Sequence, residues 1–542
     1  MNNRLNMVIL IIMVSLLVFP SEIFASSEIL PSGIKDSEIG GVIEAYIKEK
    51  EDTSSAVSIV VFRGDETIFK TVYGYANIEE QIKADDETVY EWGSVGKLLV
   101  WVSVMQLWEK GEIDLDTDVN QYLPEGFISK LNYDKPITMK NLMNHNAGFE
   151  DTVFQMCAED EKSILELGEA LKLTQPQQIF EPGTVVSYSN WSTALAGYIV
   201  EQISGQAFYD YVQEHIFKPL DMKHTALEPT YSDNPWVKEK LLEAQGYTYE
   251  LEPMDDGLFL INLYPAGSVA GTLDDFTKFA KALLPNSDEQ EKLFKNKESL
   301  DEMLEPTLKY PDTDINYNNH GFWSHEFSVQ ALGHGGNTNM YSSYLLFDPV
   351  TSVGLVIMTN QGNEVTYNYG IPPMIFGKIG EMATREERGS IAEIEGLYYS
   401  ARTIRNGIDK MYSILGILPY IDDGQGNLNA NLFGLAEVTA RQIAPNTFIT
   451  TQQIGSLEID SIERYSYNNG IRRLSSIYAE TLEADVDIWA LAVVTILFIV
   501  AILWSIFLLI VNLIKFVIEK IKKRERIHDS FKKYEIILNI CQ

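Results

Sequence analysis

The stretch that decides the fold is Trp92–Gly111, which reads WGSVGKLLVWVSVMQLWEKG. From Leu98 to Trp108 it is apolar on nearly every side, and a helix of that composition lies inside a domain rather than on its surface. Gly111 supplies a C-cap. The stretch therefore predicts a buried helix around which a domain is packed.

Two reactive side chains stand at the start of this helix. Ser94 and Lys97 are three residues apart, so both lie on one face. A hydroxyl held beside an amine provides a nucleophile and a base. The same S-x-x-K pattern recurs at Ser32–Lys35 and Ser530–Lys533, so the pattern alone leaves catalysis and coincidence equally open. Partners elsewhere in the chain must decide between them.

Length and charge narrow the classes of function. The chain has 542 residues, more than one compact domain, and a net charge of −35, which argues against nucleic acid as a partner. Its two cysteines, Cys157 and Cys541, flank the membrane segment predicted below, so we expect no disulfide. We expect neither a metal ion nor a cofactor.

Both ends of the chain carry signals for export and membrane insertion. Residues 1–25 have the order of parts of a secretory signal peptide, with an uncleaved anchor as the alternative. Ile488–Ile514 carries no charge and is long enough to cross a bilayer. Lysines and arginines follow at once, which predicts a cytoplasmic tail at 515–542 and an extracellular catalytic domain in a single-pass membrane protein.

The segments between these ends predict a mixture of strands and helices. Ala56–Phe62 and Thr67–Tyr73 form an expected β-hairpin. His145, near the end of a short helix within Ile137–Gly148, is expected to bond the backbone rather than to catalyse. Further helices are expected at about 191–204 and 273–284, and strands at 327–332, 341–348 and 353–360.

Two polar segments are candidate partners for Ser94. Tyr188 and Asn190 alternate in direction on a loop before a helix, although an ordinary turn has the same composition. Gly333–Thr338 reads GHGGNT between two predicted strands. Glycines are needed where the backbone must approach another group closely. Either a tight turn or a strand edge beside a ligand would explain them.

We divide the chain into five parts. Residues 1–25 are a signal peptide, 26–385 a hydrolase domain, and 386–487 a small, partly β juxtamembrane domain. A transmembrane helix follows at 488–514, and a basic cytoplasmic tail at 515–542.

Three ordered motifs give the chain a family resemblance. Ser94-Val95-Gly96-Lys97, Tyr188-Ser189-Asn190 and His334-Gly335-Gly336 resemble the motifs of the serine β-lactamase/penicillin-binding-protein superfamily, in particular its class C β-lactamase-related hydrolases. The resemblance covers roughly residues 40–380. It implies an α/β (α+β) fold, in which a mainly antiparallel sheet flanked by helices stands beside a helical lobe with the active site between them.

The resemblance also implies roles for the motif residues. Ser94 would be the nucleophile, with Tyr188 or the Lys97–Tyr188 pair as general base, since a Lys97 ammonium favours the phenolate. Asn190 would hold the Lys97 ammonium and the substrate amide. The oxyanion would lie between the backbone N–H groups of Ser94 and Asn337. The substrate-binding residues implied are Asn190, His334, Gly336 and Asn337.

One departure from the family pattern affects the substrate. Penicillin-recognising members commonly have Lys-Thr-Gly where this chain has His334-Gly335-Gly336. Histidine is only partly protonated near neutral pH, and Gly335 lacks a hydroxyl that could bind a carboxylate. This departure does not affect the residues expected to form the acyl-enzyme. As an alternative to binding substrate, His334 would orient Tyr188.

The sequence therefore predicts an exported, membrane-anchored serine acyl hydrolase. Its substrate would be a small molecule or peptide: a cell-wall D-amino-acid peptide from peptidoglycan, a β-lactam or an ester. An α/β-hydrolase would need G-x-S-x-G, but Trp92 occupies the first position and Lys97 stays unexplained. The remaining alternative is a non-catalytic surface receptor or sensor that retains the penicillin-binding fold.

Overall fold

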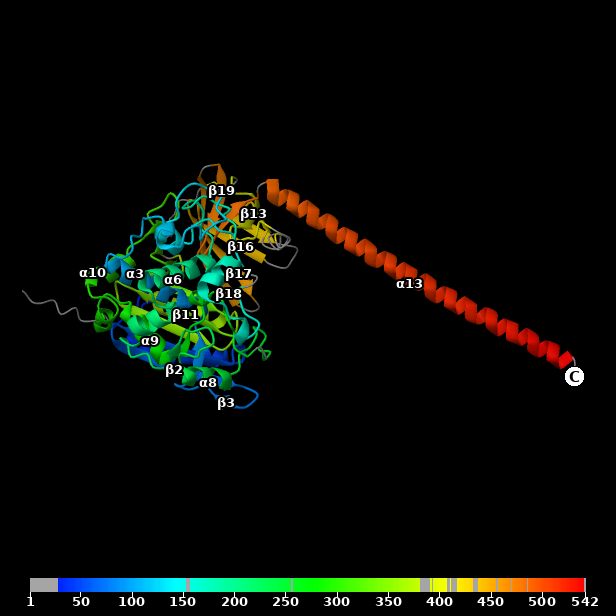
Figure 1. Cartoon of the computed structure of the whole chain (residues 1–542), viewed down its shortest axis with the longest axis horizontal. Coiled ribbons are helices and arrows are strands. Elements are labelled where there is room, and N and C mark those ends of the chain that lie inside the picture. Colours follow the sequence, from blue (N-terminus) through cyan, green and yellow to red (C-terminus); the bar gives the residue numbers. More distant parts are fainter. Residues whose placement is uncertain are drawn as a thin grey trace, which may run out of the picture.

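A computed structural model of the chain describes residues 28–540 except 153–155, 255–256, 381–389, 392, 407–409, 411–416, 432–436, 455–456, 469 and 485. The predicted signal peptide, Cys541 and the boundary predicted at 385 lie outside the described residues. The described part forms a rounded body, a barrel against one side of it, and one long helix that projects away from both (Figure 1).

The body is built on a nine-stranded antiparallel sheet. The order of its strands is β3-β2-β1-β12-β11-β10-β9-β8-β7. The predicted hairpin is confirmed, because β1 pairs antiparallel with β2. In the order of the sheet, the strands are β3 (Ile82–Lys83), β2 (Glu66–Asn77), β1 (Ala56–Arg63), β12 (Val353–Thr359), β11 (Ser342–Asp348), β10 (Gln330–Asn337), β9 (Phe322–Glu326), β8 (Asn316–Asn319) and β7 (Leu308–Lys309).

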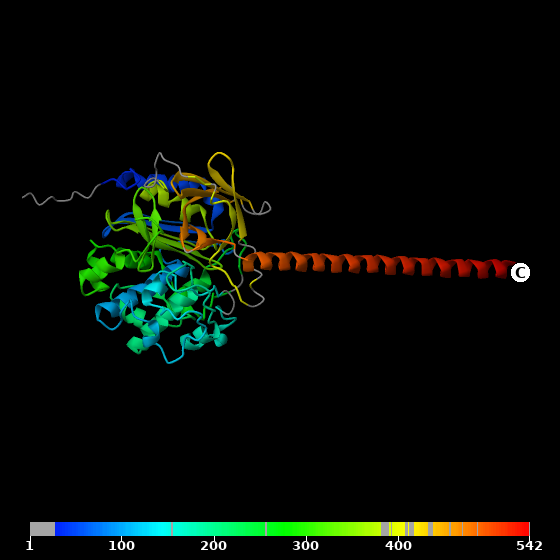
Figure 2. The same ribbon diagram turned by 90° about the horizontal axis from the view of Figure 1, so that it is seen from above.

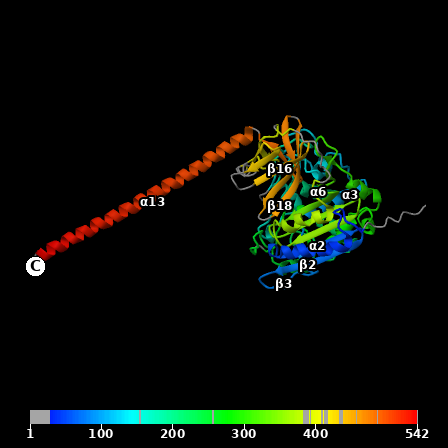
Figure 3. The same cartoon turned by 180° about the vertical axis from the view of Figure 1, so that it is seen from behind.

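Helices cover both faces of this sheet, which explains why its central strands are almost continuously apolar. On one face, Ile59 and Val61 of β1 pack with α2 (Asp36–Glu49), α11 (Thr366–Gly370) and α12 (Pro372–Phe376). Figure 3 shows α2 lying on this face. On the other face, Val60 and Phe62 join the larger core that contains α3.

The predicted buried helix is α3 (Lys97–Glu109), and every residue from Lys97 to Leu107 is buried. It begins directly after a 3-10 turn, Gly93–Gly96, and packs against α6 (Asn190–Ser204). The other helices of the body are α4 (Met139–Met143), α5 (Leu167–Leu173), α7 (Phe208–Val212), α8 (Pro235–Glu243), α9 (Leu273–Ala282) and α10 (Lys297–Leu304). A small sheet, in the order β4 (Val89–Glu91), β6 (Ala270–Thr272) and β5 (Thr225–Ala226), lies near them.

One strand differs from the sequence prediction. Gly333–Asn337 was expected between two strands but belongs to β10, where these residues pair with Ser342–Leu346 of β11. Glycine is tolerated there because the neighbours are too close for side chains: a Cβ on Gly333 would lie 1.9 Å from the Leu345 carbonyl oxygen. The glycines therefore mark close packing within a strand rather than a turn.

The region after the body forms a closed, eight-stranded antiparallel barrel. It lies beside the sheet at the end from which the long helix departs (Figure 2). Its strands, each paired with the next, are β13 (Gly396–Ser400), β14 (Ile417–Asp422), β15 (Asn427–Asn431), β16 (Glu437–Ala444), β17 (Thr447–Ile454), β18 (Leu457–Asn468), β19 (Ile471–Ser475) and β20 (Glu480–Glu483).

The last helix, α13 (Val486–Ile540), projects away from the body (Figure 1). Among the described residues it is the one helix whose length and composition would allow it to cross a membrane, within Ile496–Tyr534. Residues 515–540 of the predicted tail continue this helix rather than forming a separate segment. Its lysine, arginine and glutamate residues are good helix formers, and it contains neither proline nor glycine.

A buried ion pair fastens the barrel to the body. The Arg464 guanidinium on β18 donates to both carboxylate oxygens of Glu326 on β9, at 2.5 and 2.6 Å. Their side chains are only 2% and 4% exposed. Because a charge left unpaired in such a place is costly, the pair requires both domains to be docked.

Removing one partner of this pair should be strongly destabilising. We expect Arg464→Met to lower the free energy of unfolding by about 3–5 kcal/mol, since the Glu326 carboxylate would stay buried without a counter-charge. Urea denaturation of the detergent-solubilised chain, followed by tryptophan fluorescence, measures the change. Lys35→Met, which removes an exposed pair with Glu38, is the control and should cost less than about 1 kcal/mol. Equal losses would show that the Arg464 pair does not hold the domains together.

Candidate active site

Ser94 lies in a turn that enters the core between β10 and the segment around Ala266. Two glycines permit this entry. Gly93 has a φ of +53°, and a Cβ on it would lie 2.8 Å from the Asn337 nitrogen. A Cβ on Gly96 would lie 2.6 Å from the Val269 side chain. The turn thus brings Ser94 to a cavity of about 460 Å³ that has residues of the body and of the barrel in its walls.

Lys97 contacts the Ser94 hydroxyl directly. Its Nζ lies 3.0 Å from Ser94 Oγ and donates to the Ala266 carbonyl oxygen at 2.6 Å. The side chain is fully buried, and burial lowers the pKa of Lys97 well below its ordinary value, with a smaller contribution in the same direction from the Arg402 charge. A neutral amine hydrogen-bonded to a hydroxyl is able to accept its proton.

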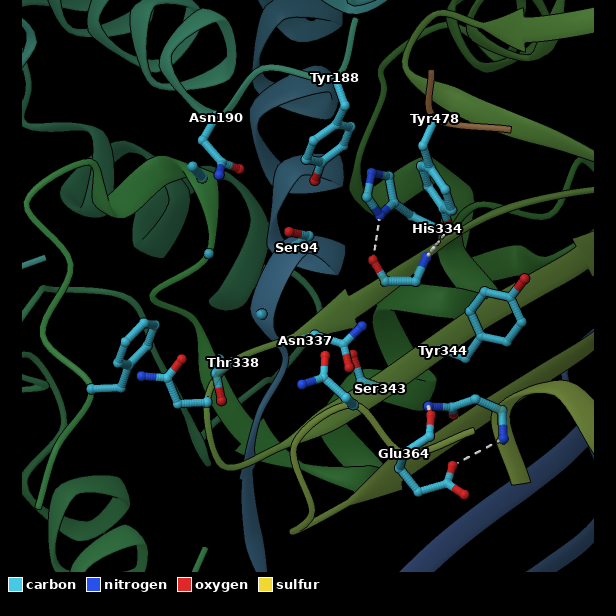
Figure 4. A pocket seen from close by; sticks show the side chains of 18 of the residues that line it. Ser94, Tyr188, Asn190, His334, Asn337, Thr338, Ser343, Tyr344, Glu364 and Tyr478 are labelled. Atoms are coloured by element: carbon cyan, nitrogen blue, oxygen red, sulfur yellow. Dashed lines mark hydrogen bonds between the residues drawn. The ribbon is translucent and has the colours of Figure 1, made fainter. Parts of the chain in front are cut away.

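Tyr188 stands over the same two groups. Lys97 Nζ lies 4.9 Å from the centroid of its ring, and its hydroxyl points toward Ser94 (Figure 4). Burial raises the pKa of Tyr188, and the neighbouring Ser94 hydroxyl lowers it by less. Burial therefore favours the neutral phenol. It disfavours both charges of the predicted ammonium–phenolate pair, and the choice of Tyr188 or the Lys97–Tyr188 pair as general base stays a prediction.

His145 is structural, as the sequence predicted. Its Nδ1 accepts a hydrogen bond from the Ser189 backbone N–H at 3.1 Å, and its ring stacks on Trp323 with centroids 5.5 Å apart. The ring also lies 4.5 Å from that of Tyr188. His145 thus holds the Tyr188 loop in place without reaching Ser94.

Asn190 forms another wall of the cavity. It is the first residue of α6, directly after the N-cap residue Ser189, whose hydroxyl accepts from the Ser192 N–H. Figure 4 shows it on the opposite side of Ser94 from His334. The structure therefore brings Ser94, Lys97, Tyr188 and Asn190 together from two helix N-termini.

The β10 edge supplies backbone groups to the cavity. The Gly335 N–H points away from β11, since it donates to the Tyr478 hydroxyl at 3.1 Å. Strand residues two apart point the same way, so the Asn337 N–H faces this open edge as well. Asn337 lies against the Ser94 turn, and the oxyanion position between its N–H and that of Ser94 stays a prediction.

Gly336 is not one of the described residues that line the cavity, and its expected part in binding substrate stays a prediction. A Cβ on Gly336 would lie 2.0 Å from the Trp92 carbonyl oxygen and 2.7 Å from Ser343 Oγ. Its role is close packing, because it lets β10 approach the chain just before Ser94.

His334 lies in the cavity wall as a neutral ring. Burial lowers the pKa of His334 to about 3. Its Nδ1 lies 2.6 Å from the Gly335 carbonyl oxygen, and its ring centroid lies 5.9 Å from that of Tyr188. His334 therefore offers no cation to a substrate carboxylate and is placed beside Tyr188.

Two residues of the barrel side also line the cavity, and the sequence analysis missed both. Arg402 follows β13, and its guanidinium carbon lies 5.1 Å from the Tyr188 ring centroid while Nε donates to the Asp151 carboxylate at 2.8 Å. Tyr478 lies in the turn between β19 and β20. Neither belongs to a motif, and both are far from Ser94 in the chain, so no local pattern could have revealed them.

These groups can carry out acyl transfer. A hydroxyl nucleophile, an amine in contact with it, a nearby phenol and two backbone donors converge on one cavity. Within the described ranges, no group of three or more His, Cys, Asp or Glu side chains is arranged to hold a metal ion.

Comparison with known proteins places the chain in a family. The sequence model of the family described as Beta-lactamase matches residues 43–371, more than half of the chain. Protein flp of Staphylococcus aureus (strain MW2) is 22% identical over 344 residues, which cover 63% of this chain and 66% of that protein. Putative penicillin-binding protein PbpX of Bacillus subtilis (strain 168) is 27% identical over 253 residues, 46% of this chain and 60% of that one. The chain thus spans less than two thirds of these relatives.

Solved structures share the fold. SurE gives a TM-score of 0.57 at 18% identity over 83% of this chain and 99% of that one, and it has also been solved with D-Leu. D-amino acid amidase from Ochrobactrum anthropi SV3 gives 0.50 at 23% identity, covering 61% and 94%. Beta-lactamase/D-alanine carboxypeptidase from Pseudomonas syringae gives 0.51 at 18%, covering 62% and 98%. The predicted α/β (α+β) fold is confirmed, and the SurE likeness extends beyond residues 43–371.

A neutral Lys97 in the folded protein predicts stability that rises with pH. The unfolded chain keeps this lysine charged up to its ordinary pKa of about 10.4, so the unfolded state binds more protons. The free energy of unfolding should then increase by about 1.4 kcal/mol per pH unit relative to Lys97→Met, which lacks this contribution. Urea denaturation of both proteins at pH 7, 8 and 9 measures the difference. Parallel pH dependence in the two proteins would mean that Lys97 is charged when folded.

Proposed function

Because the chain belongs to the beta-lactamase family, we propose that it is a serine acyl hydrolase that works through a covalent acyl-Ser94 intermediate. The observation that carries the proposal is the buried Lys97 amine, 3.0 Å from Ser94 Oγ at the wall of a cavity. Burying a charged lysine is costly. Burial here therefore favours the neutral amine, which can accept a proton.

The proposed reaction has a proton path. Lys97 accepts the Ser94 proton as Oγ attacks the acyl carbonyl carbon, and the N–H groups of Ser94 and Asn337 stabilise the oxyanion. The neutral Tyr188 phenol then donates its proton to the leaving group and is reprotonated by the Lys97 ammonium. Water attacks the acyl-enzyme in the second half, with the proton moving in the opposite direction. Asn190 orients the substrate amide.

The proposed substrates are amides and esters of D-amino acids, including cell-wall peptides and β-lactams. Support comes from the relatives, which include a D-amino acid amidase and a D-alanine carboxypeptidase. His334 is neutral, so an acidic group of the substrate would meet the Arg402 guanidinium, which lines the same cavity. The cation would then come from Arg402 rather than from position 334, where penicillin-recognising relatives commonly have lysine.

We also propose that the enzyme is anchored in the cell membrane by the span at 488–514. The catalytic domain (26–385) and the barrel region (386–487) would then be outside the cell, after removal of a signal peptide at 1–25, with 515–542 inside. The apolar α13 and the basic residues on its second half support this topology. Peptidoglycan would be within reach of the cavity in that arrangement.

Loss of the Ser94 hydroxyl should abolish covalent chemistry. We expect Ser94→Ala to remove labelling by a fluorophosphonate and all turnover, because no other group provides the attacking oxygen. Ser103→Ala, on the same helix, removes a hydroxyl that only bonds the Leu99 carbonyl and is the matched control. Gel fluorescence and D-Ala release are the measurements. Labelling that persists in Ser94→Ala contradicts the proposal, and labelling without turnover of any substrate indicates a receptor instead.

The proposed topology is testable on intact cells. Protease added from outside should remove the body and barrel and spare an epitope tag at the C-terminus, because the basic half of α13 stays in the cytoplasm. Immunoblotting against the tag should show a short protected fragment. A tag that is degraded without cell lysis would contradict this orientation.

A further inference from the structure

Tyr478 is held in an unusual conformation at the edge of the active site. Its φ is +74°, a region that bulky residues seldom adopt and that is often associated with function. The surrounding turn is pinned to the Tyr188 loop, because Tyr188 N–H donates to the Tyr478 carbonyl at 3.2 Å and Glu480 N–H donates to the Val186 carbonyl at 3.0 Å. The barrel thus fixes one aromatic side chain beside the proposed proton donor.

The phenol of Tyr478 fills the space that Gly335 leaves empty. A Cβ on Gly335 would lie only 3.1 Å from the Tyr478 hydroxyl oxygen. The same oxygen accepts the Gly335 N–H at 3.1 Å, so its own proton remains for a second partner (Figure 4). A residue other than glycine at position 335 could have carried a hydroxyl on β10. Here the hydroxyl at this place belongs to Tyr478 of the barrel, more than 140 positions later in the chain.

The direction of the substrate follows from the proposed proton path. The leaving group must lie next to Tyr188, which gives it a proton, and the Tyr478 ring lies 5.9 Å from the Tyr188 ring on that side. Asn190 is on the other side of Ser94 (Figure 4). Gly335 and Asn337 are two residues apart on one strand edge, so the Tyr478 hydroxyl is roughly 7 Å from the oxyanion position.

We propose that Tyr478 is a specificity-determining residue that donates its phenolic hydrogen to the carboxylate of the leaving amino acid. The inference rests on the proposed function and adds the group that selects the substrate. A terminal amino acid carries its carboxylate about two bonds beyond the scissile nitrogen, which suits a donor at that distance from the oxyanion position. An amine leaving group without a carboxylate would leave the Tyr478 proton unused.

Two peptides that differ only in this carboxylate provide the test. One is an acyl-D-alanyl-D-alanine, and the other ends in ethylamine in place of the last D-alanine. Each is used to protect Ser94 of the full-length, detergent-solubilised chain against fluorophosphonate labelling, so that binding is measured without requiring turnover. We expect the wild-type protein to be protected at concentrations of the D-alanine peptide at least tenfold lower.

The variant Tyr478→Phe removes only the hydroxyl and keeps the ring contacts. The preference for the D-alanine peptide should fall roughly 10- to 100-fold, the range for one hydrogen bond to a charged group. Tyr398→Phe is the matched control, since this barrel phenol bonds the Ile394 carbonyl away from the cavity, and it should keep the wild-type preference. A merely structural role for Tyr478 would weaken protection by both peptides equally and would overturn the inference.

A second substitution tests where the hydroxyl is needed. Gly335→Ser in the Tyr478→Phe background returns a hydroxyl to β10 in the space that the phenol oxygen vacates, and it should restore most of the preference. In the wild-type background the same serine would crowd the phenol at 3.1 Å and should reduce it. No preference in the wild-type protein, or none restored by the serine, overturns the inference. Failure of Ser94 itself to react would instead overturn the proposed function.

Discussion

The desolvation of Lys97 is the constraint on which the rest of the site depends. A charged lysine needs water or a counter-ion, and α3 offers neither, because every residue from Lys97 to Leu107 is buried. The amine instead has the Ser94 hydroxyl and the Ala266 carbonyl as partners, both of which suit a neutral or transiently charged nitrogen. The apolar helix at the centre of the domain core is thus the same element that lowers the proton affinity of the Lys97 amine. Stability and chemistry oppose each other at this residue, since the buried amine weakens the fold below pH 10.

Much of this arrangement could be predicted from local patterns in the sequence. The all-round apolar stretch at 98–108 identified the buried helix, and alternation with a turn identified the β1–β2 hairpin. The order of three short motifs brought Ser94, Tyr188 and Asn190 together. The strand at Gly333–Asn337 was not predictable, because glycines between two apolar segments of a sequence are typical of a turn. Its real cause is the proximity of Trp92 and Leu345, which only the folded chain reveals. The burial that lowers the pKa of Lys97 was not predictable for a similar reason, since burial on all sides is a property of the packing.

The barrel could not be assigned to the site from sequence, because its contribution is a matter of docking. Arg402 and Tyr478 reach the cavity only when the buried Arg464–Glu326 pair and the strand-like contact between 186–188 and 478–480 are in place. Contacts of such long sequence separation leave no periodic or motif signal. Arg402 and Tyr478 belong to no sequence motif. From sequence alone, this region contains only short apolar segments between turns. The physical consequence is that the cavity is complete only in the two-part structure.

Under the proposed function, the body supplies the reactive groups and the barrel supplies groups that select the substrate. Ser94, Lys97, Tyr188 and the β10 backbone all belong to the body, where close packing leaves little room for change: a Cβ on Gly93 or Gly336 would collide with backbone atoms. Arg402 and Tyr478 come from loops of the barrel. Hydrogen bonds and ion pairs, among them Arg464–Glu326 and Arg402–Asp151, hold the barrel to the body. Under the proposed function, a hydroxyl and a cation that β10 could have provided come instead from the Tyr478 and Arg402 side chains of the barrel side. The glycine at 335 is what makes that exchange sterically possible, because it opens the strand edge to a side chain from another domain.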